Sequence, residues 1–232
     1  MPIIKISGVI IPNDYQEIYD WLGWDATSPN KVARQINDAN NGDLEVEINS
    51  GGGSVFAGSE IYTALKSYEG NVVGKIVGIA ASAASVVAMG CNKLLMSPTS
   101  QMMIHNATVE THGDYREMDH TSNFLKNVNQ TIANAYKIKS GKNDDEILSL
   151  MDDETWFTPQ QALEQKLIDE IMFQNEFQVV ASHGSGLLPI DVVNKIKNEI
   201  LKDKTEPSNN KADFLMAKLN LLKLKGDMTN DN

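Results

Sequence analysis

Residues 44–55, which read LEVEINSGGGSV, contain the pattern that decides the fold. Leu44 to Ile48 alternates apolar with acidic side chains, which is the two-residue period of a β-strand. Three glycines follow immediately, and a segment with the helical spacing of apolar residues runs from Ser59 to Tyr68. We therefore expect a strand that turns through glycines into a helix, the repeating unit of an α/β domain.

The flanking segments repeat this alternation. β-Branched residues predict a strand over 3–11, and Ser28-Pro29 predicts the start of a helix that closes at Asn41-Gly42. Further along the chain, we expect strands over 72–77, 93–96 and 102–104, and a buried helix of small and apolar residues over 80–89. This order predicts an α/β fold with largely parallel strand pairing.

Helices dominate the next part of the sequence. A long, polar helix is predicted from Arg116 to Lys139, with Gly141 as its stop. Shorter helices are expected over 144–151 and 158–167, followed by a last strand region over 168–180.

The C-terminal residues have a different composition. His183-Gly184-Ser185-Gly186 predicts a flexible joint, and amphipathic helices are expected over 189–202 and 214–224. We therefore divide the chain into a domain over 1–180 and a flexible linker with a helical C-terminal extension over 181–232.

The composition limits the possible functions. The 232 residues are 41% hydrophobic and carry a formal net charge of -11, so a broad surface for nucleic acid is not expected. The longest apolar stretch, residues 77–90, is shorter than the about 20 residues that span a bilayer. No signal peptide follows Met1, and these features together predict a cytoplasmic protein without a membrane partner.

The single cysteine, Cys91, can form neither an internal disulfide nor a metal cluster by itself. It predicts a reducing compartment. A thiol nucleophile is one interpretation of Cys91, but a packed cysteine is favoured because free cysteines are commonly buried. No nucleotide-binding motif is present, and neither a cofactor nor a metal site is predicted.

Three patterns contain residues suited to catalysis, and each also has a purely structural interpretation. The glycines after Ile48 can bind a phosphate or an oxyanion, or simply form a tight turn. Ser82, between a strand and a helix of small residues, can be a nucleophile or a helix cap. His105 ends an apolar strand, where it can be a general base or a core residue.

Taken together and in this order, the motifs resemble the Clp protease proteolytic subunit, from about Ile3 to Ile171. The sequence is still more similar to the Clp-type peptidases found among phage head-assembly genes. The features that carry the resemblance are Asn49-Ser50-Gly51-Gly52-Gly53, Gly78-Ile79-Ala80-Ala81-Ser82-Ala83-Ala84-Ser85, Met103-Ile104-His105-Asn106 and Glu154-Thr155-Trp156.

The resemblance implies a role for each of these residues. Ser82 would be the nucleophile and His105 the general base. The backbone N–H groups of Gly53 and Ala83 would form the oxyanion hole. The residues expected to contact substrate are Gly52, Ser54 and Asn106. The family has a proline before its paired glycines and this chain has Gly51, so we expect a more mobile loop before substrate binds.

The third member of the triad is predicted by position. Counting back from Ala162 without a gap, the family's aspartate falls on Glu154. Asp153 is the second choice, and Asp152 lies beside it. The structural alternative is that these three acids only charge an exposed turn.

The resemblance also implies architecture and partners. It predicts a crotonase-like α/β fold of repeated strand–strand–helix units with a protruding handle helix, and a ring-shaped homo-oligomer of heptamers or stacked heptamers. The expected substrates are phage capsid, scaffold or portal proteins, processed in the host cytoplasm or inside a procapsid.

Three alternatives remain. One is a peptidase that works with a host AAA+ unfoldase, although the sequence starts almost at the first strand and docking to an ATPase is therefore not expected. The second is an inactive ring-forming assembly protein, and the third is a crotonase-type acyl-CoA enzyme.

Overall fold

The computed structural model of the protein describes residues 1–39 and 42–174. In this part of the chain a single mixed sheet is built from eight strands. The strands are β1 (Ile3–Ile10), β2 (Ala26–Thr27), β3 (Leu44–Gly53), β4 (Val72–Ala81), β5 (Lys93–Met96), β6 (Gln101–Ile104), β7 (Thr155–Phe157) and β8 (Glu170–Ile171). The helices are η1 (Asn13–Tyr15), α1 (Gln16–Leu22), α2 (Pro29–Asp38), α3 (Val55–Lys66), α4 (Ala83–Ala88), α5 (Tyr115–Ser140), α6 (Asp144–Asp152) and α7 (Pro159–Glu164).

The sheet is almost entirely parallel. Its strands follow the order β2-β1-β3-β4-β5-β8, and β6 pairs with β4 away from this path. Strand β4 has two partners in succession, because residues 73–76 pair with β5 and residues 79–81 pair with β6. Only the β6–β7 pair is antiparallel among the described strands. The predicted α/β fold with parallel pairing is therefore confirmed.

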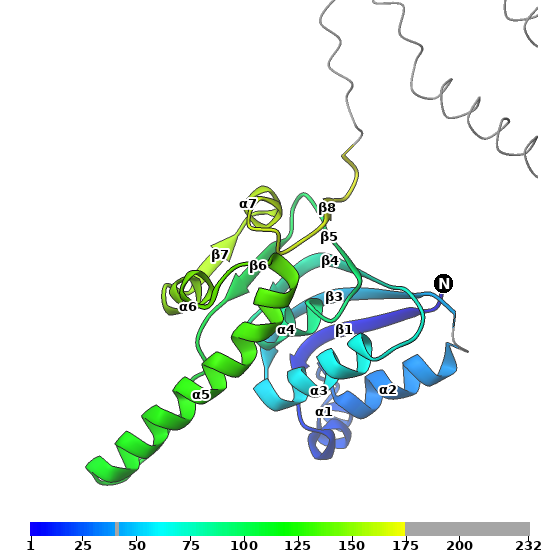
Figure 1. The fold of residues 1–232 in the computed structure, drawn as a ribbon. Helices are drawn as coiled ribbons and strands as arrows, with labels where there is room; N and C mark the ends of the chain where they lie inside the picture. The colour runs from blue at the N-terminus through cyan, green and yellow to red at the C-terminus, as the bar shows by residue number, and fades with distance from the viewer. Residues whose placement is uncertain (40–41, 175–232) are drawn as a thin grey trace, which may run out of the picture. The chain divides into compact units, whose positions relative to one another are not determined.

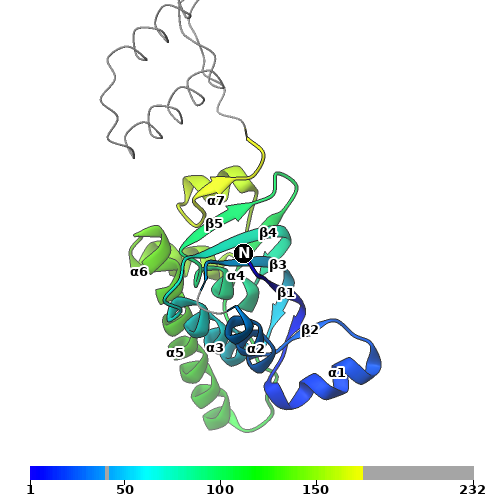
Figure 2. The same cartoon turned by 90° about the vertical axis from the view of Figure 1, so that its right-hand side faces the viewer.

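Helices α2, α3 and α4 lie together over β1, β3 and β4, and two views show this arrangement (Figures 1 and 2). The core between them consists of aliphatic side chains from the strands and small residues from α4, including Ile4, Ile48, Ile76, Ala84 and Val87, all 0% exposed. Burial of this apolar surface is the main force that holds helix to sheet. The helix of small residues lies at the centre of the domain because its narrow side chains allow close approach to the strands.

Side-chain caps define several helix starts. Ser28 Oγ accepts a hydrogen bond from Lys31 N–H, and Pro29 occupies the first turn, as the sequence predicted for α2. Ser54 Oγ accepts from Ala57 N–H, so α3 begins at Val55 rather than at the predicted Ser59. The earlier start is a local capping effect that the spacing of apolar residues did not indicate.

Two strands are longer than predicted. Strand β3 continues through the glycines to Gly53, where it remains paired with Ile10 of β1. Strand β4 continues to Ala81, so the prediction of a helix from residue 80 is wrong. Ala80 and Ala81 pair with Met102 and Met103 of β6, and this tertiary pairing overrides the helical preference of alanine. Helix α1 and strands β2 and β7 were not predicted.

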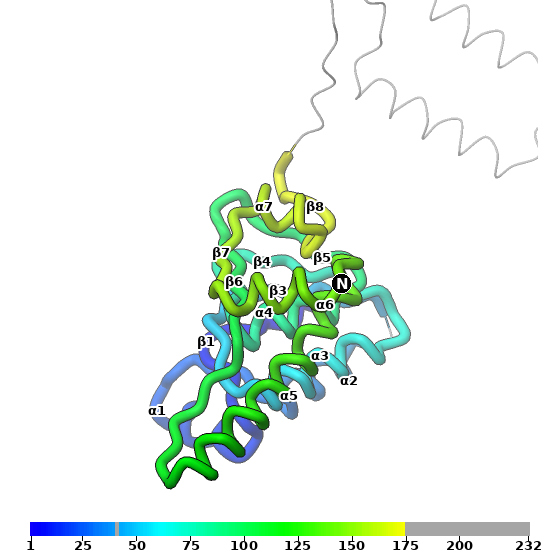
Figure 3. The backbone as a smooth tube through the Cα atoms, turned by 60° about the vertical axis from the view of Figure 1, so that its left-hand side comes forward, coloured from blue at the N-terminus to red at the C-terminus, as the bar shows by residue number. Residues whose placement is uncertain are grey.

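Helix α5 is the predicted long helix, and the structure confirms it as the handle of the fold. Asp114 caps its start through bonds from Arg116 N–H and Glu117 N–H, and Gly141 ends it with a φ of 74°. Its buried residues all lie in its C-terminal part: Ile132, Ala133, Ala135, Tyr136 and Ser140. The N-terminal part extends away from the sheet, as the ribbon and the tube both show (Figures 1 and 3).

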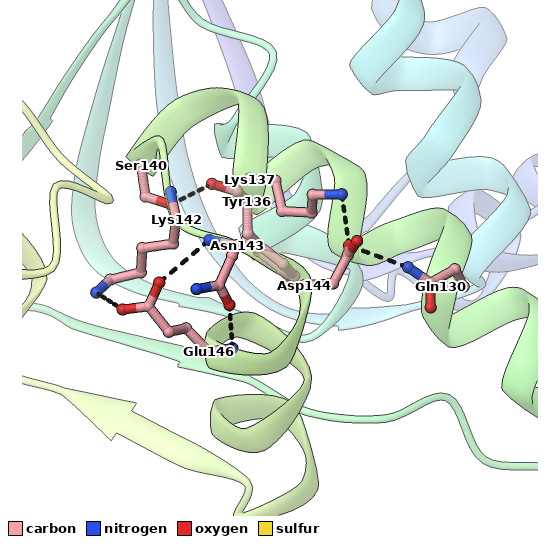
Figure 4. Close-up of polar contacts among 8 residues, drawn as sticks. All are labelled: Gln130, Tyr136, Lys137, Ser140, Lys142, Asn143, Asp144 and Glu146. Atoms are coloured by element: carbon pink, nitrogen blue, oxygen red, sulfur yellow. Dashed lines mark hydrogen bonds and ion pairs between the residues drawn. The ribbon is translucent and has the colours of Figure 1, made fainter.

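Polar contacts join the end of α5 to α6 (Figure 4). Asp144 pairs with Lys137 and accepts a hydrogen bond from Gln130. Asn143 and Glu146 form a reciprocal capping box at the start of α6. Exposed ion pairs contribute little to stability, so we assign these contacts mainly to defining the turn between the two helices.

Cys91 lies in the core with 1% of its surface exposed. Burial raises the pKa of its thiol to about 12, so the reactive thiolate is not formed near neutral pH. The preferred interpretation of Cys91 as a packed residue is confirmed.

Several predictions fall at the limits of the described chain. The described helices include none that is both apolar enough and long enough to cross a membrane. In the described part of the last strand region, residues 168–174, only Glu170–Ile171 form a strand, β8, so the predicted strand is shorter there. The boundary at residue 180, the joint at 183–186 and the helices over 189–202 and 214–224 lie outside the described residues.

Candidate active site

Neighbouring parallel strands bring the three predicted motifs to one edge of the sheet. The glycines form the end of β3, Ser82 follows β4, and His105 follows β6. Strand β4 pairs with both β3 and β6 in parallel. The carboxyl ends of parallel strands meet at the same edge, which is where ligand sites form in α/β proteins.

Ser82 lies at the junction between β4 and α4 in an unusual backbone conformation, with φ 55° and ψ -127°. Its hydroxyl makes no capping hydrogen bond to α4. A positive φ in a residue other than glycine costs about 1–3 kcal/mol, so the surroundings must stabilise it. Strain of this kind is typical of turns that present a functional side chain.

The hydroxyl of Ser82 instead faces the histidine. The distance from His105 Nε2 to Ser82 Oγ is 2.8 Å, within hydrogen-bonding range. The His105 side chain is half-buried, one residue beyond the end of β6. In the tautomer with Nε2 unprotonated, the serine hydroxyl donates to this nitrogen, which is the arrangement needed for proton transfer from a serine to a neutral imidazole.

Backbone hydrogen bonds surround Ser82 on both sides. Its N–H donates to Met103 O at 3.0 Å, which ties the turn to β6. Its carbonyl oxygen accepts from Ser85 N–H at 3.0 Å and from Ser85 Oγ at 2.6 Å. Ser85 Oγ lies 2.9 Å from Tyr136 Oη of α5. The sequence patterns predicted no role for Ser85 or Tyr136, because no local pattern indicates that residues 51 positions apart are in contact.

The glycines of β3 lie directly against this turn. A Cβ atom on Gly52 would be 2.7 Å from both Ala81 O and Ser82 Cβ, and 2.9 Å from Ala83 N. A Cβ atom on Gly53 would be 2.2 Å from Ile10 O. Both residues also have a positive φ, 97° and 145° respectively. Glycine is therefore required at both positions by space and by backbone conformation.

Two of the predicted substrate-contacting side chains have partners within the chain. Ser54 Oγ caps α3, and Ser54 N–H donates to Ile10 O at 2.8 Å. Asn106 Nδ2 donates to Asp152 Oδ1 at 2.7 Å. Asn106 Oδ1 is buried and has no partner among the described residues. The third predicted contact, Gly52, donates its N–H to Ser50 Oγ at 3.1 Å.

The three acidic residues after α6 have different environments. Asp152 accepts the bond from Asn106, and Asp153 is the C-terminal cap of α6. Glu154 is exposed and has a φ of 47°. The antiparallel pairing of β6 and β7 ends with Ile104 opposite Thr155, and these two residues are the chain neighbours of His105 and Glu154. In the described part of the chain, His105 has a hydrogen bond to Ser82 and none to a carboxylate.

The fold and this site define an α/β protein that holds a serine hydroxyl against a histidine ring at the edge of a parallel sheet, an arrangement used by serine hydrolases. The chain belongs to the Clp protease family, because the family model described as Clp protease matches residues 27–175.

Individual relatives agree with this assignment. An ATP-dependent Clp protease proteolytic subunit from Bacteroides fragilis is 31% identical over 134 residues, which cover 57% of this chain and 65% of the relative. The corresponding subunit from Ligilactobacillus salivarius is 34% identical over 136 residues, covering 56% and 67%. Subunit 2 from Tropheryma whipplei is 26% identical over 164 residues, covering 67% and 91%. The chain thus spans slightly less than two thirds of the Bacteroides fragilis relative.

The close contact at Gly52 predicts a position-specific effect on stability. Gly52→Ala should lower the free energy of unfolding by about 1–3 kcal/mol, because the new methyl group has no room beside Ala81 and Ser82. Gly51→Ala is the matched control, since a Cβ atom at Gly51 would meet no other atom within 4 Å and its φ is not positive. Its effect should stay within about 0.5 kcal/mol. Urea denaturation of both variants measures the difference, and equal stability would contradict this account of Gly52.

Proposed function

We propose that this protein is a serine endopeptidase that hydrolyses peptide bonds through an acyl-enzyme. The observation that carries the proposal is the 2.8 Å contact between Ser82 Oγ and His105 Nε2. Membership of the Clp protease family supports the same reaction class. An inactive assembly protein would have no need to maintain a strained serine against a histidine, so we rank that alternative lower.

In the proposed reaction, Ser82 Oγ attacks the carbonyl carbon of the scissile peptide bond while His105 Nε2 accepts the hydroxyl proton. The imidazolium then gives this proton to the leaving amine, and the acyl group remains on Ser82. Water, activated by the same histidine, attacks the acyl-enzyme and releases the second product. The protonated His105 returns its proton to Ser82 Oγ, which restores the starting state.

The oxyanion formed in each step requires hydrogen-bond donors. Ala83 is the first residue of α4, where backbone N–H groups have no intrahelical acceptor. Gly52 approaches Ala83 N closely enough that a Cβ would lie 2.9 Å away, so the end of β3 borders the same space. We assign the donors to Ala83 N–H and Gly53 N–H, each contributing about 3 kcal/mol to stabilising the transition state.

Glu154 is our choice for the third triad residue. The choice is supported by the pairing of Thr155, the next residue, with Ile104, which precedes His105, and by the exposure of the Glu154 side chain. Asp152 is less suited because it is bonded to Asn106. A carboxylate at His105 Nδ1 would select the tautomer in which Nε2 accepts the serine proton.

We further propose that the protein assembles into rings through copies of itself. The projecting part of α5 carries large apolar side chains that are well exposed in the single chain, namely Tyr115, Met118 and Phe124. Exposed apolar side chains on a projecting helix favour association with another surface. The substrates that we propose are phage capsid, scaffold or portal proteins, on the basis of the resemblance to phage head-assembly peptidases.

A second candidate function has its own support. The relatives are described as ATP-dependent proteolytic subunits. This description favours a proteolytic subunit that receives unfolded chains from an AAA+ partner, and the substrate test below distinguishes it from head processing.

Labelling with a fluorophosphonate probe should depend on the two central residues. The wild-type protein should react and Ser82→Ala should not. The labelling rate of His105→Ala should be lower than that of the wild type by a factor of about 10³ or more. Ser59→Ala, a serine of α3 outside the site, serves as the control and should label normally. Native mass spectrometry on the same samples should give a ring-sized mass. Failure of the wild-type ring to label would refute the peptidase proposal.

The choice of acid can be tested with neutral variants of similar shape. Glu154→Gln should slow labelling by roughly 10²–10⁴-fold, because His105 would lose the carboxylate that orients it. Asp153→Asn is the matched comparison and should stay close to the wild-type rate. The reverse result would assign the role to Asp153, and normal rates in both would show that neither acid orients the histidine.

The two candidate substrates predict different requirements. Incubated alone with purified capsid, scaffold or portal protein, the wild type should produce discrete fragments that are missing with Ser82→Ala, as gel electrophoresis and mass spectrometry would show. Degradation of casein only when a host unfoldase and ATP are present would instead favour general turnover.

A further inference from the structure

A chain of hydroxyl groups connects helix α5 to the backbone of Ser82. Ser85 Oγ lies 2.6 Å from Ser82 O and 2.9 Å from Tyr136 Oη. A carbonyl oxygen can only accept, so the single hydroxyl hydrogen of Ser85 is donated to Ser82 O. Tyr136 Oη–H must then donate to Ser85 Oγ. The direction of both hydrogen bonds therefore follows from the geometry.

These groups are isolated from water. Ser85 is 0% exposed and Tyr136 is 1% exposed. Burial raises the pKa of the Tyr136 phenol, so it stays protonated and remains a donor. A buried hydroxyl without a hydrogen-bond partner costs free energy. The Tyr136–Ser85–Ser82 arrangement is therefore strongly preferred over conformations that leave one of these hydroxyls unpaired.

The chain ends on the residue whose conformation needs support. Ser82 has a φ of 55°, and its carbonyl accepts from Ser85 Oγ as well as from the N–H groups of Ser85 and Val86. On its other side, Ser82 N–H donates to Met103 O, two residues before His105. Rotation of the Ser82 backbone would therefore have to break the hydroxyl chain.

We propose that Ser85 and Tyr136 are positioning residues, which hold the Ser82 backbone in its strained, positive-φ conformation and so direct Oγ toward His105. This inference rests on the proposed role of Ser82 as nucleophile. It also makes the packed part of the handle helix a support of the reactive serine, because Tyr136 is one of the buried residues of α5.

The test removes one hydroxyl at a time and follows fluorophosphonate labelling. Tyr136→Phe and Ser85→Ala should each lower kinact, the rate constant for covalent reaction of the bound probe, about 5–10-fold. This is the effect of about one lost hydrogen bond. The constant KI, which measures reversible binding of the probe before it reacts, should not change, because both side chains are buried and should not contact the probe.

A double variant makes the test specific. Tyr136 acts only through Ser85, so adding Tyr136→Phe to Ser85→Ala should cause no further loss of kinact. Ser140→Ala is the control: its buried hydroxyl lies on the same helix and donates to Tyr136 O at 2.7 Å (Figure 4). It should reduce thermal stability and leave kinact unchanged.

Hydrogen exchange gives a readout that does not require activity. The amides of Ser85 and Val86 both donate to Ser82 O, and they should exchange faster in Tyr136→Phe than in the wild type or Ser140→Ala. Unchanged exchange would overturn the proposal, as would wild-type kinact in Tyr136→Phe and Ser85→Ala, or additive losses in the double variant. A wild-type protein that fails to label would refute the peptidase proposal, and Ser82 would then not be a nucleophile for Ser85 and Tyr136 to direct. Hydrogen exchange would still show whether the hydroxyl chain holds the turn at Ser82.

Discussion

The hydrogen bonds around Ser82 are the constraint on which the rest of the site depends. The N–H of Ser82 is tied to β6 and its carbonyl is tied to α4 and, through Ser85, to α5. With both peptide groups held, the strained φ of 55° becomes the stable conformation, and the direction of the Ser82 Cα–Cβ bond is fixed. The contact with His105 Nε2 is the consequence of this backbone arrangement.

The strand order explains why so many of these contacts are available. Strand β4 changes partner from β5 to β6 along its length, and this change brings the end of β6 next to the end of β4. The end of β3 approaches from the other side, where Gly52 leaves no space for a side chain. A serine, a histidine and a glycine-lined backbone are thus assembled from three segments separated by more than 20 residues. The sheet positions them because parallel strands end at a common edge.

The handle helix has two parts with different physical roles. Its N-terminal part extends from the sheet and exposes apolar side chains, whereas its C-terminal part is packed in the core. Tyr136 lies in the packed part and reaches the turn at Ser82 through Ser85. Assembly contacts and the proposed reactive serine would therefore share one rigid element, which would give the long helix a mechanical role.

Sequence patterns alone determined the α/β class, most of the helices and strands, the packed state of Cys91 and the residues Ser82 and His105 as candidates. These follow from periodicity, caps and motif order, which depend on near neighbours in the chain. Only the tertiary structure decided that β4 runs to Ala81, that β7 pairs with β6 and that Tyr136 contacts Ser85. The physical reason is that strand register and buried hydrogen bonds join residues about 20 to 50 positions apart, and no local pattern records such pairings.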